Sequence, residues 1–310
     1  MASVPFIIAG LGEALYDVFP DHQVLGGAPL NMAVHAHQLG QPLGGTATVI
    51  SRIGQDVLGR QIIAELAARG MSRQYLQTDP DRSTGTVAVT VDADGQPTYN
   101  IVRDVAWDMI QFDPDLEYLA QNCHAVTFGT LAQRVAQSRN TIYRFLDATR
   151  RAIRLFDVNL RQDYYDNRII RRSCEFADAI KLNAEELPVV MRELGLSRIG
   201  AGSDDVSGMC QALIDEFELR FVAYTRGKHG TVLYRPGERY EDAAVSYPAA
   251  DRADAVGAGD VCTAALLIGA IKSWPPEKTV NTANHLGAYV ASQPGGTPTL
   301  PDELVDMANG

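Results

Sequence analysis

Residues 254–260 read D-A-V-G-A-G-D and lead into the apolar run V-C-T-A-A-L-L-I-G-A-I-K, residues 261–272. The run contains no proline, and two prolines at positions 275 and 276 stop any helix there. We therefore predict a buried helix with Asp260 at its N-terminus. Gly257, Ala258 and Gly259 form the turn that leads into this helix, and the remaining elements are placed around it.

A turn of small residues before a helix has a chemical use. The first backbone N–H groups of a helix lack intrahelical partners, and the helix dipole adds partial positive charge there. Small residues let a phosphate approach the backbone closely. We therefore predict an anion site at residues 257–259, with Asp260 as a base beside the anion. A structural role also suits these residues, because aspartate is a favoured N-cap and glycine a common turn residue.

The composition is that of an ordinary globular protein. The chain has 310 residues, of which 46% are hydrophobic and 21% charged, and its formal net charge is −11. This charge argues against a nucleic-acid or anionic-membrane surface, and no apolar run approaches the roughly 18 residues of a membrane span. The four cysteines form no C-x-x-C pair, and the start shows no secretory signal. We therefore expect a single domain over residues 1–310, reduced thiols and a cytoplasmic location.

Apolar runs separated by helical segments indicate an α/β protein. Strands are expected over residues 6–12, 13–20, 46–54, 125–128 and 154–161 and within 176–183 and 220–230, and helices over 32–40, 59–69, 138–150 and 281–292. Residues 84–107 differ, because two β-branched runs, 86–91 and 98–102, flank D-A-D-G-Q-P. This pattern predicts an antiparallel hairpin and hence a small sheet apart from the main one.

Polar residues at two predicted strand ends are candidates for a site. Asp157, Asn159 and Arg161 form a D-x-N-x-R pattern, and the C-terminal strand ends of a parallel sheet carry its ligand site. An exposed strand end is the alternative, and we favour the site. Asn183 and Glu186 open the next helix, where an N-cap and an acid in the first turn would explain them without any ligand.

Glycines also precede the helix predicted over 32–40. Residues 26–31 read G-G-A-P-L-N, which would let a ligand approach the backbone with Asn31 facing it, although a tight turn alone would use the same residues. The chain contains no G-x-x-x-x-G-K-[ST], which excludes a Walker-type P-loop. No complete G-x-G-x-x-G follows the first strand, which argues against a dinucleotide-binding dehydrogenase.

Residues 254–260 resemble the second signature of the PfkB, or ribokinase-like, carbohydrate kinases, typically D-T-x-G-A-G-D. The resemblance implies that Gly257, Ala258 and Gly259 stabilise the transferring phosphoryl group. It also implies that Asp260 takes the proton from the substrate hydroxyl. One position departs from the pattern, because Ala255 stands where the family usually has threonine or serine.

The N-terminal part resembles the same family. G-E-x-L-x-D at residues 12–17 and G-G-A-P-x-N-x-A at residues 26–33 match its pattern, and the G-G-A-P and D-x-N-x-R forms are similar to bacterial fructokinases. The resemblance implies a lid over the sugar, built from residues of about 13–25 and 84–107. It implies sugar contacts from six residues: Asp17, Gly27, Asn31, Arg103, Asn159 and Arg161. Carboxylates and carboxamides suit this task because they make paired hydrogen bonds to adjacent hydroxyls.

Further motifs imply nucleotide and metal sites. Residues 183–186 resemble the family's N-x-x-E motif and residues 224–230 its V-T-x-G-x-x-G pattern. The resemblance implies four residues in nucleotide binding: Asn183, Thr225, Gly227 and Asn284. It implies that Glu186 holds Mg²⁺ through water, and that Asp254, Val256 and Gly295 belong to a monovalent-cation site for K⁺.

The resemblance covers residues 6 to 304 and implies a three-layer α/β/α sandwich with a mostly parallel central sheet and a small β-sheet lid. The implied activity is transfer of the ATP γ-phosphoryl group to a primary hydroxyl of a small sugar, with fructose preferred. A kinase for 2-keto-3-deoxygluconate, a ribose-type sugar or a nucleoside is the alternative. A non-catalytic sugar- or nucleotide-binding protein is another, supported by Ala255. Expected partners are the sugar and ATP, without nucleic acid or membrane, and a second copy of the chain bound through the lid.

Overall fold

The computed structural model describes residues 5–91, 97–196 and 205–309. Its large sheet contains β1 (Phe6–Leu11), β4 (Gly45–Gly54), β5 (Leu76–Asp79), β8 (Ala125–Phe128), β9 (Ile153–Asp157), β10 (Ala179–Asn183), β11 (Phe221–Thr225), β12 (Thr231–Arg235) and β13 (Glu238–Glu241). The strand order is β13-β12-β11-β10-β9-β8-β1-β4-β5. Neighbours from β11 to β5 are parallel, whereas β11–β12 and β12–β13 are antiparallel. The carboxyl ends of the parallel strands therefore meet along one edge.

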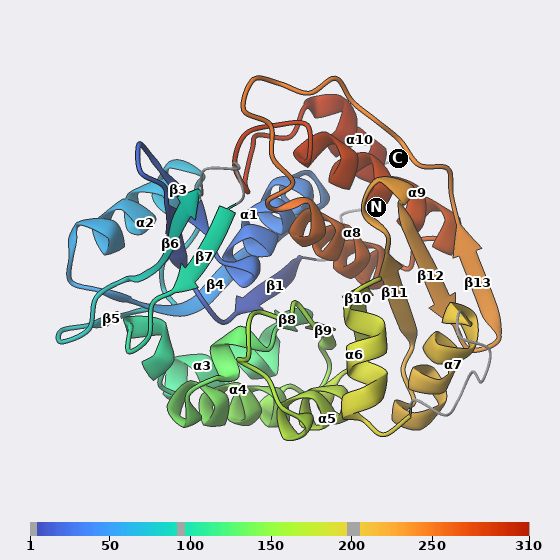
Figure 1. Ribbon diagram of the computed structural model, residues 1–310, viewed down its shortest axis with the longest axis horizontal. Helices are drawn as coiled ribbons and strands as arrows, with labels where there is room; N and C mark the ends of the chain where they lie inside the picture. The colour runs from blue at the N-terminus through green and yellow to red at the C-terminus, as the bar shows by residue number, and fades with distance from the viewer. Residues whose placement is uncertain (1–4, 92–96, 197–204, 310) are drawn as a thin grey trace.

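Helices cover both faces of this sheet (Figure 1). One face packs against α3 (Pro114–Asn122), α4 (Ala136–Ala148), α5 (Asn167–Phe176), α6 (Glu186–Glu193) and α7 (Val206–Phe217). The other packs against α1 (Ala28–Gly40), α2 (Val57–Ala68), α8 (Ala258–Lys272), α9 (Pro276–Val290) and α10 (Asp302–Asn309). Short 3₁₀ turns lie at η1 (Gln41–Leu43), η2 (Ala106–Met109), η3 (Leu131–Gln133) and η4 (Gly227–His229). The predicted three-layer sandwich is confirmed.

A second sheet stands apart from the first. It contains β2 (Leu15–Val18), β3 (Gln23–Gly26), β6 (Gly85–Val91) and β7 (Pro97–Ile101) in the order β3-β2-β6-β7. The β6–β7 pair is antiparallel, as the two β-branched runs predict. The predicted turn of this hairpin, residues 92–96, lies outside the described residues. The small sheet therefore draws its strands from both segments predicted to form the lid.

Helix α8 is the central helix of its layer. It packs between α1 and α9, and its side chains from Val261 to Ile268 are almost fully buried. A helix that is apolar on all sides is stable only when neighbours surround it. The helix ends at Lys272, where Ser273 adopts a left-handed conformation before the two prolines. Its N-terminus is therefore held at a fixed place in the interior.

Several predicted boundaries were wrong, and proline and backbone conformation explain them. Helix α1 begins at Ala28 instead of residue 32, and α9 at Pro276 instead of residue 281, because proline fits the first turn of a helix. Helix α2 begins at Val57, two residues before the predicted start, because the Asp56 side chain caps it. Strand β9 ends at Asp157 instead of residue 161, since Asn159 has φ 40 and leaves the extended conformation.

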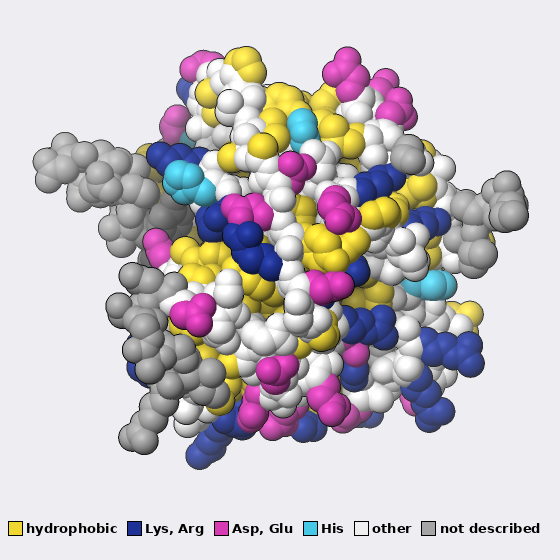
Figure 2. Space-filling view, turned by 90° about the vertical axis from the view of Figure 1, so that its right-hand side faces the viewer, with side chains coloured by type: hydrophobic (Ala, Val, Ile, Leu, Met, Phe, Trp, Pro, Cys, Tyr) yellow, Lys and Arg dark blue, Asp and Glu magenta, His cyan; other side chains and the backbone are white. Residues whose placement is uncertain are grey.

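The molecular surface is mixed in charge. On the face that looks out from the right-hand side of Figure 1, acidic and basic side chains are interspersed (Figure 2). Within the described residues, no helix combines the length and the apolar character needed to cross a bilayer.

Candidate active site

A cavity of about 900 Å³ lies between the small sheet and the carboxyl ends of the main-sheet strands. Leu15, Val87 and Ile101 line it from the small sheet. The structure brings thirteen of the predicted site residues to this one cavity: Asp17, Gly27, Asn31, Asn159, Arg161, Asn183, Glu186, Thr225, Asp254, Val256, Gly257, Gly259 and Asp260. Residues from the two ends of the sequence therefore share one site.

Asp260 lies in the first turn of α8, at the cavity wall. Its Oδ2 accepts a hydrogen bond of 2.9 Å from Nδ2 of Asn31, which comes from the first turn of α1. Burial raises the pKa of Asp260 to about 6, with the largest opposing effect from the Lys181 ammonium group. The carboxylate is therefore oriented, ionised above about pH 6 and a stronger base than an exposed aspartate.

The turn before Asp260 presents unsatisfied donors. Gly257 has φ 80 and precedes the first helical residue, Ala258. The backbone N–H groups of Gly257, Gly259 and Asp260 have no hydrogen-bond partner within the described part of the chain. Three free donors at the positive end of a helix, beside a buried base, form the predicted anion site.

The turn is held from behind by a second loop. The Asp254 carboxylate accepts hydrogen bonds from the N–H groups of Val256 and Gly295, at 2.9 and 3.2 Å, and so ties residues 254–256 to residues 293–296. A Cβ on Gly257 would lie 2.0 Å from the Gly296 carbonyl oxygen. That oxygen accepts a 3.0 Å hydrogen bond from the His35 ring, whose pKa burial lowers to about 4. A neutral His35 thus fixes the loop against the turn.

A buried ion pair lies directly beneath the turn. Lys181 Nζ donates to both carboxylate oxygens of Asp157 at 2.8 Å, and Thr263 Oγ1 of α8 donates to the same carboxylate at 2.8 Å. Burial lowers the pKa of Lys181, but the Asp157 carboxylate more than offsets this, so the net shift is upward. A Cβ on Gly259 would be 3.2 Å from Nζ, so the ammonium charge lies close to the anion site.

Glu13 contributes a buried carboxyl group with one unsatisfied oxygen. It follows β1, it is 3% exposed, and its Oε2 has no hydrogen-bond partner within the described residues. Burial raises the pKa of Glu13 to about 7, and the Asp260 carboxylate adds to this shift while Arg161 opposes it. Glu13 is therefore partly protonated near neutral pH.

The side of the cavity toward the small sheet carries the predicted sugar contacts. Burial raises the pKa of Asp17, on β2, to about 6, and the Arg161 guanidinium opposes this shift. Asn31 keeps its Oδ1 unsatisfied within the described residues, so this acceptor can receive a ligand hydroxyl. Charged and amide groups of this kind select polyhydroxyl ligands because buried groups must be satisfied.

A second cavity of about 450 Å³ adjoins the first and shares Thr225, Ala255 and Gly259 with it. The predicted nucleotide residues Thr225, Gly227 and Asn284 line it, together with Ala258 and Lys228. The Asn284 Oδ1 accepts a 2.8 Å hydrogen bond from the N–H of Thr231, which fixes the side chain between α9 and β12. The anion site therefore lies where the two cavities meet.

Asn183 and Glu186 make the reciprocal bonds of a helix start. Asn183 Oδ1 accepts from the N–H groups of Glu185 and Glu186, and the Glu186 carboxylate accepts from Asn183 N–H and Leu160 N–H, all at 2.9 Å. Burial raises the pKa of Glu186. Both residues also line the large cavity, so the structural role and a ligand role coexist.

Arg103 is the predicted sugar contact that the structure places elsewhere. Its side chain is 71% exposed, donates to the Tyr164 hydroxyl at 2.9 Å, and lines a separate cavity of about 250 Å³. Arg134 lies in the same cavity, stacked 4.0 Å from the Trp107 ring and paired with Asp108.

The sequence reasoning missed the roles of Glu13 and Lys181. A signal existed for Lys181, because a lysine within the apolar strand A-I-K-L is rarely buried without a partner. Glu13 directly follows the first strand, at the edge where a parallel sheet places its site. Its partners depend on Arg161 and Asp260, which no local pattern connects to it.

Comparisons with known proteins agree with this arrangement. Residues 12–303 match the pfkB family carbohydrate kinase domain. The chain is 30% identical to a fructokinase of Klebsiella pneumoniae and 27% identical to one of Escherichia coli, each time over 94% of this chain and 95% of the relative. An uncharacterized sugar kinase from Pyrococcus horikoshii has a similar structure, with TM-score 0.78, 25% identity and 98% of each chain covered. A Vibrio cholerae fructokinase double mutant, solved with fructose, ADP and potassium ion, has TM-score 0.78 at 22% identity, with 98% of each chain covered.

Proposed function

The chain belongs to the pfkB family of carbohydrate kinases, and from that premise we propose that it phosphorylates fructose on a primary hydroxyl with ATP as the donor. The observation that carries this proposal is the position of Asp260. Its oriented carboxylate lies beside three free backbone N–H groups, where a polar cavity meets a second cavity suited to a nucleotide. Base, anion site and two ligand cavities are the parts that phosphoryl transfer needs.

Asp260 acts on the acceptor hydroxyl. Asn31 holds the carboxylate by the 2.9 Å bond to Oδ2, which leaves Oδ1 to receive the sugar proton. As the sugar oxygen attacks the γ-phosphorus, its proton passes to Asp260, and the bond from phosphorus to the β–γ bridging oxygen breaks. The raised pKa of about 6 keeps Asp260 ionised at neutral pH and still basic enough to accept the proton.

The anion site acts on the transferring group. The free N–H groups of Gly257, Gly259 and Asp260 face the oxygens on which charge develops, and they need no reorganisation during the reaction. The Lys181 ammonium group, close to Gly259, adds fixed positive charge. Positioning and charge neutralisation of this kind supply most of the catalysis in phosphoryl transfer.

The residues present fit Mg²⁺ bound through water. Within the described residues no group of three or more His, Cys, Asp or Glu side chains is placed to hold a metal ion, and both Glu186 oxygens already accept backbone bonds. Such a site suits Mg²⁺, which keeps several waters and binds substrate phosphates. Glu186 would accept a hydrogen bond from one of those waters, and the ion supplies charge neutralisation on the phosphates. The tied loops 254–256 and 293–296 offer backbone carbonyls to K⁺.

Fructose is proposed over other acceptors for two reasons. The D-x-N-x-R and G-G-A-P patterns place Asn159, Arg161 and Asn31 in the sugar cavity. The two relatives at 30% and 27% identity are fructokinases. The competing acceptors are 2-keto-3-deoxygluconate, ribose and a nucleoside, which differ from fructose in ring form and charge.

The test is ATP consumption with Mg²⁺ and K⁺ across fructose and these competing acceptors, with the Asp260→Asn variant in parallel. We expect the highest kcat/KM with fructose, and a loss of at least about 1000-fold in kcat for the variant, as is typical when a general base is removed. Asparagine keeps the size and the contact with Asn31, so thermal melting should show a folded variant.

Other outcomes separate the remaining functions. Turnover with a different acceptor would replace fructose but keep the kinase. Near-normal turnover by Asp260→Asn would refute the role of Asp260 as base. ATP binding without turnover on any acceptor would favour a non-catalytic binding protein and direct attention to Ala255.

A further inference from the structure

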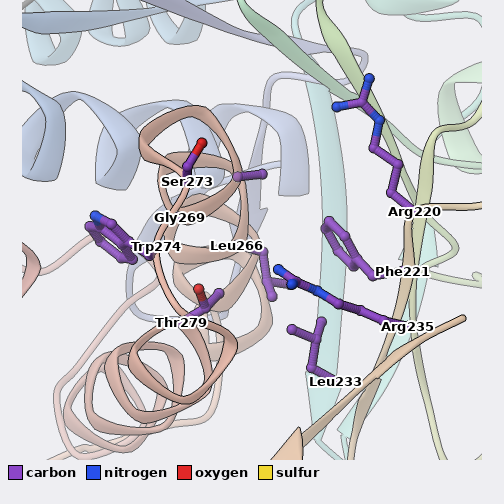
Figure 3. A pocket seen from close by; sticks show the side chains of 10 residues that line it. Arg220, Phe221, Leu233, Arg235, Leu266, Gly269, Ser273, Trp274 and Thr279 are labelled. Carbon is purple, nitrogen blue, oxygen red and sulfur yellow. The ribbon is translucent and has the colours of Figure 1, made fainter. Parts of the chain in front are cut away.

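A cavity of about 380 Å³ lies at the opposite end of α8 from Asp260 (Figure 3). Leu266, Gly269 and Ser273 line it from the last turns of α8, and Phe221 and Leu233 line it from β11 and β12. In Figure 3 the helix forms one wall and the two strands form the other. This volume lies within the range of small-molecule sites. None of the residues used in the proposed kinase reaction lines it.

The body of the cavity is apolar and partly aromatic. Phe221, Leu233 and Leu266 belong to the hydrophobic core, so their exposed faces in the cavity are the edge of that core. Trp274 lies across from them, half-buried, and the Lys278 ammonium group lies 4.6 Å from the centre of its ring. A fixed indole ring opposite a phenyl ring suits a planar, apolar ligand body.

Two arginines give the cavity a positive charge. Alternation along β12 places Arg235 on the same face as Leu233, which is buried against α8, so an arginine occupies an inward position of an apolar face. Figure 3 shows its side chain extending into the space between strands and helix, with Arg220 at the rim. Neither guanidinium group has a hydrogen bond or ion pair within the described part of the chain.

The nearest carboxylate in the sheet does not neutralise Arg235. Glu238 lies opposite Arg235 in the β12–β13 ladder, but it hydrogen-bonds the Tyr240 hydroxyl, and Arg235 only faces the Tyr240 ring at 6.0 Å. Arginine donors that are half-buried and unpaired gain most from a ligand that brings acceptor oxygens. The acidic balance of the chain, with 38 acidic against 27 basic side chains, makes two unpaired arginines at one cavity unusual.

We propose that this cavity binds a small organic anion with an aromatic body, such as an aryl phosphate or aryl carboxylate. The aromatic part would lie between Trp274 and Phe221, and the anionic group would meet Arg235 and Arg220. Helix α8 joins this cavity to the anion site, because the same rigid helix carries Leu266 at one end and Asp260 at the other. The proposal is independent of which sugar the kinase uses.

The two tryptophans make the test direct. Trp107 is fully buried, so Trp274 is the tryptophan that a ligand in this cavity would contact. Titration of the full-length protein with phenyl phosphate should give a saturable change in tryptophan fluorescence, with a dissociation constant in about the millimolar range expected of so small a ligand. Inorganic phosphate and benzyl alcohol, which each lack one half of the probe, should bind at least about tenfold more weakly.

Matched variants locate the probe. Arg235→Gln should weaken phenyl phosphate binding by about tenfold, the effect of one lost charge-assisted bond. Arg220→Gln, at the exposed rim, should weaken it less and cannot disturb the core. Arg239→Gln, on the neighbouring strand and paired with Glu241, should leave binding unchanged. Circular dichroism checks that each variant is folded.

Three results would overturn the proposal. The first is the lack of any saturable change with phenyl phosphate. The second is equal binding by the wild-type protein, Arg235→Gln and Arg220→Gln, which would leave Arg235 only the role of complementing the negative end of α8. The third is loss of binding in Lys228→Gln with no loss in Arg235→Gln, which would place the probe in the nucleotide cavity instead.

Discussion

Helix α8 joins two cavities whose charged side chains are held in opposite ways. At its N-terminal end, Asp260 is bonded to Asn31, and Lys181 is bonded to both oxygens of Asp157. At its C-terminal end, Arg220 and Arg235 have no ion pair within the described residues. The N-terminal charges are therefore fixed before any ligand arrives, whereas the C-terminal charges can still reorient.

This difference follows from what each end must do. A catalytic group must be within a few tenths of an ångström of its working position, so its partners are built into the fold. Those partners come from α1, β9 and β10, and each pays for burial with a compensating bond. A binding cavity that only selects charge has no such requirement. Three substitutions at the N-terminal end test how far its fixed geometry matters.

The largest effect is expected for Gly257→Ala. The new Cβ would lie 2.0 Å from the Gly296 carbonyl oxygen, on a residue with φ 80, so the turn and its free N–H groups must move. We expect kcat/KM to fall by about 100-fold or more, the usual cost of misplacing reacting groups by about 1 Å. Steady-state kinetics measure this, with thermal melting for stability.

Gly237→Ala is the matched control for that change. Gly237 has φ 70, but a Cβ there would meet nothing within 4 Å, so only the backbone strain of about 1–2 kcal/mol is shared. If both variants lose the same stability and neither loses activity, the fixed position of the turn is not needed for catalysis.

A smaller effect on rate, with a distinct pH signature, is expected for Lys181→Met. The lysine charge opposes the upward shift in the pKa of Asp260, so its removal raises that pKa further above 6. The acidic limb of the kcat/KM profile should move to higher pH by about one unit, with kcat at pH 7 about tenfold lower. A pH–rate profile from pH 5 to about 9 measures the shift.

The double variant Asp157→Asn/Lys181→Met separates charge from folding. Lys181→Met alone leaves a buried, uncompensated carboxylate and should cost about 3–5 kcal/mol of stability, most of which the double variant should recover. An acidic limb at the same pH in all three proteins would show that the ion pair supports only the fold.

The smallest effect, on stability alone, is expected for Glu13→Gln. Folding raises the pKa of Glu13 from 4.5 to about 7, so the folded state binds more protons than the unfolded state between these values. The wild-type protein therefore loses stability as pH rises through this window, by on the order of 3 kcal/mol, and the neutral glutamine does not. Melting temperatures should coincide near pH 4.5 and favour the variant at pH 8. A constant difference across this range would contradict the assignment.

Local pattern was sufficient for much of the site. The apolar run after Asp260 and the prolines behind it determine a buried helix and its end, and the βα alternation determines a parallel sheet with its site at one edge. Strand ends and turns that carry Asn31, Asn183 and Thr225 were found for the same reason. Boundaries such as the end of β9 were missed because one left-handed residue, Asn159, decides them.

Contacts between distant residues were decided only by the tertiary structure. Asn31 and Asp260 are 229 residues apart, and the bond between them depends on α1 and α8 lying side by side. The pairing of Lys181 with Asp157 depends on β9 and β10 being neighbours in the sheet, and the position of Arg103 outside the sugar cavity depends on Tyr164. The sequence alone determines which groups can do chemistry, because that is a property of each residue. Their pKa values and mutual orientation depend on burial and on neighbours, which exist only once the layers have packed.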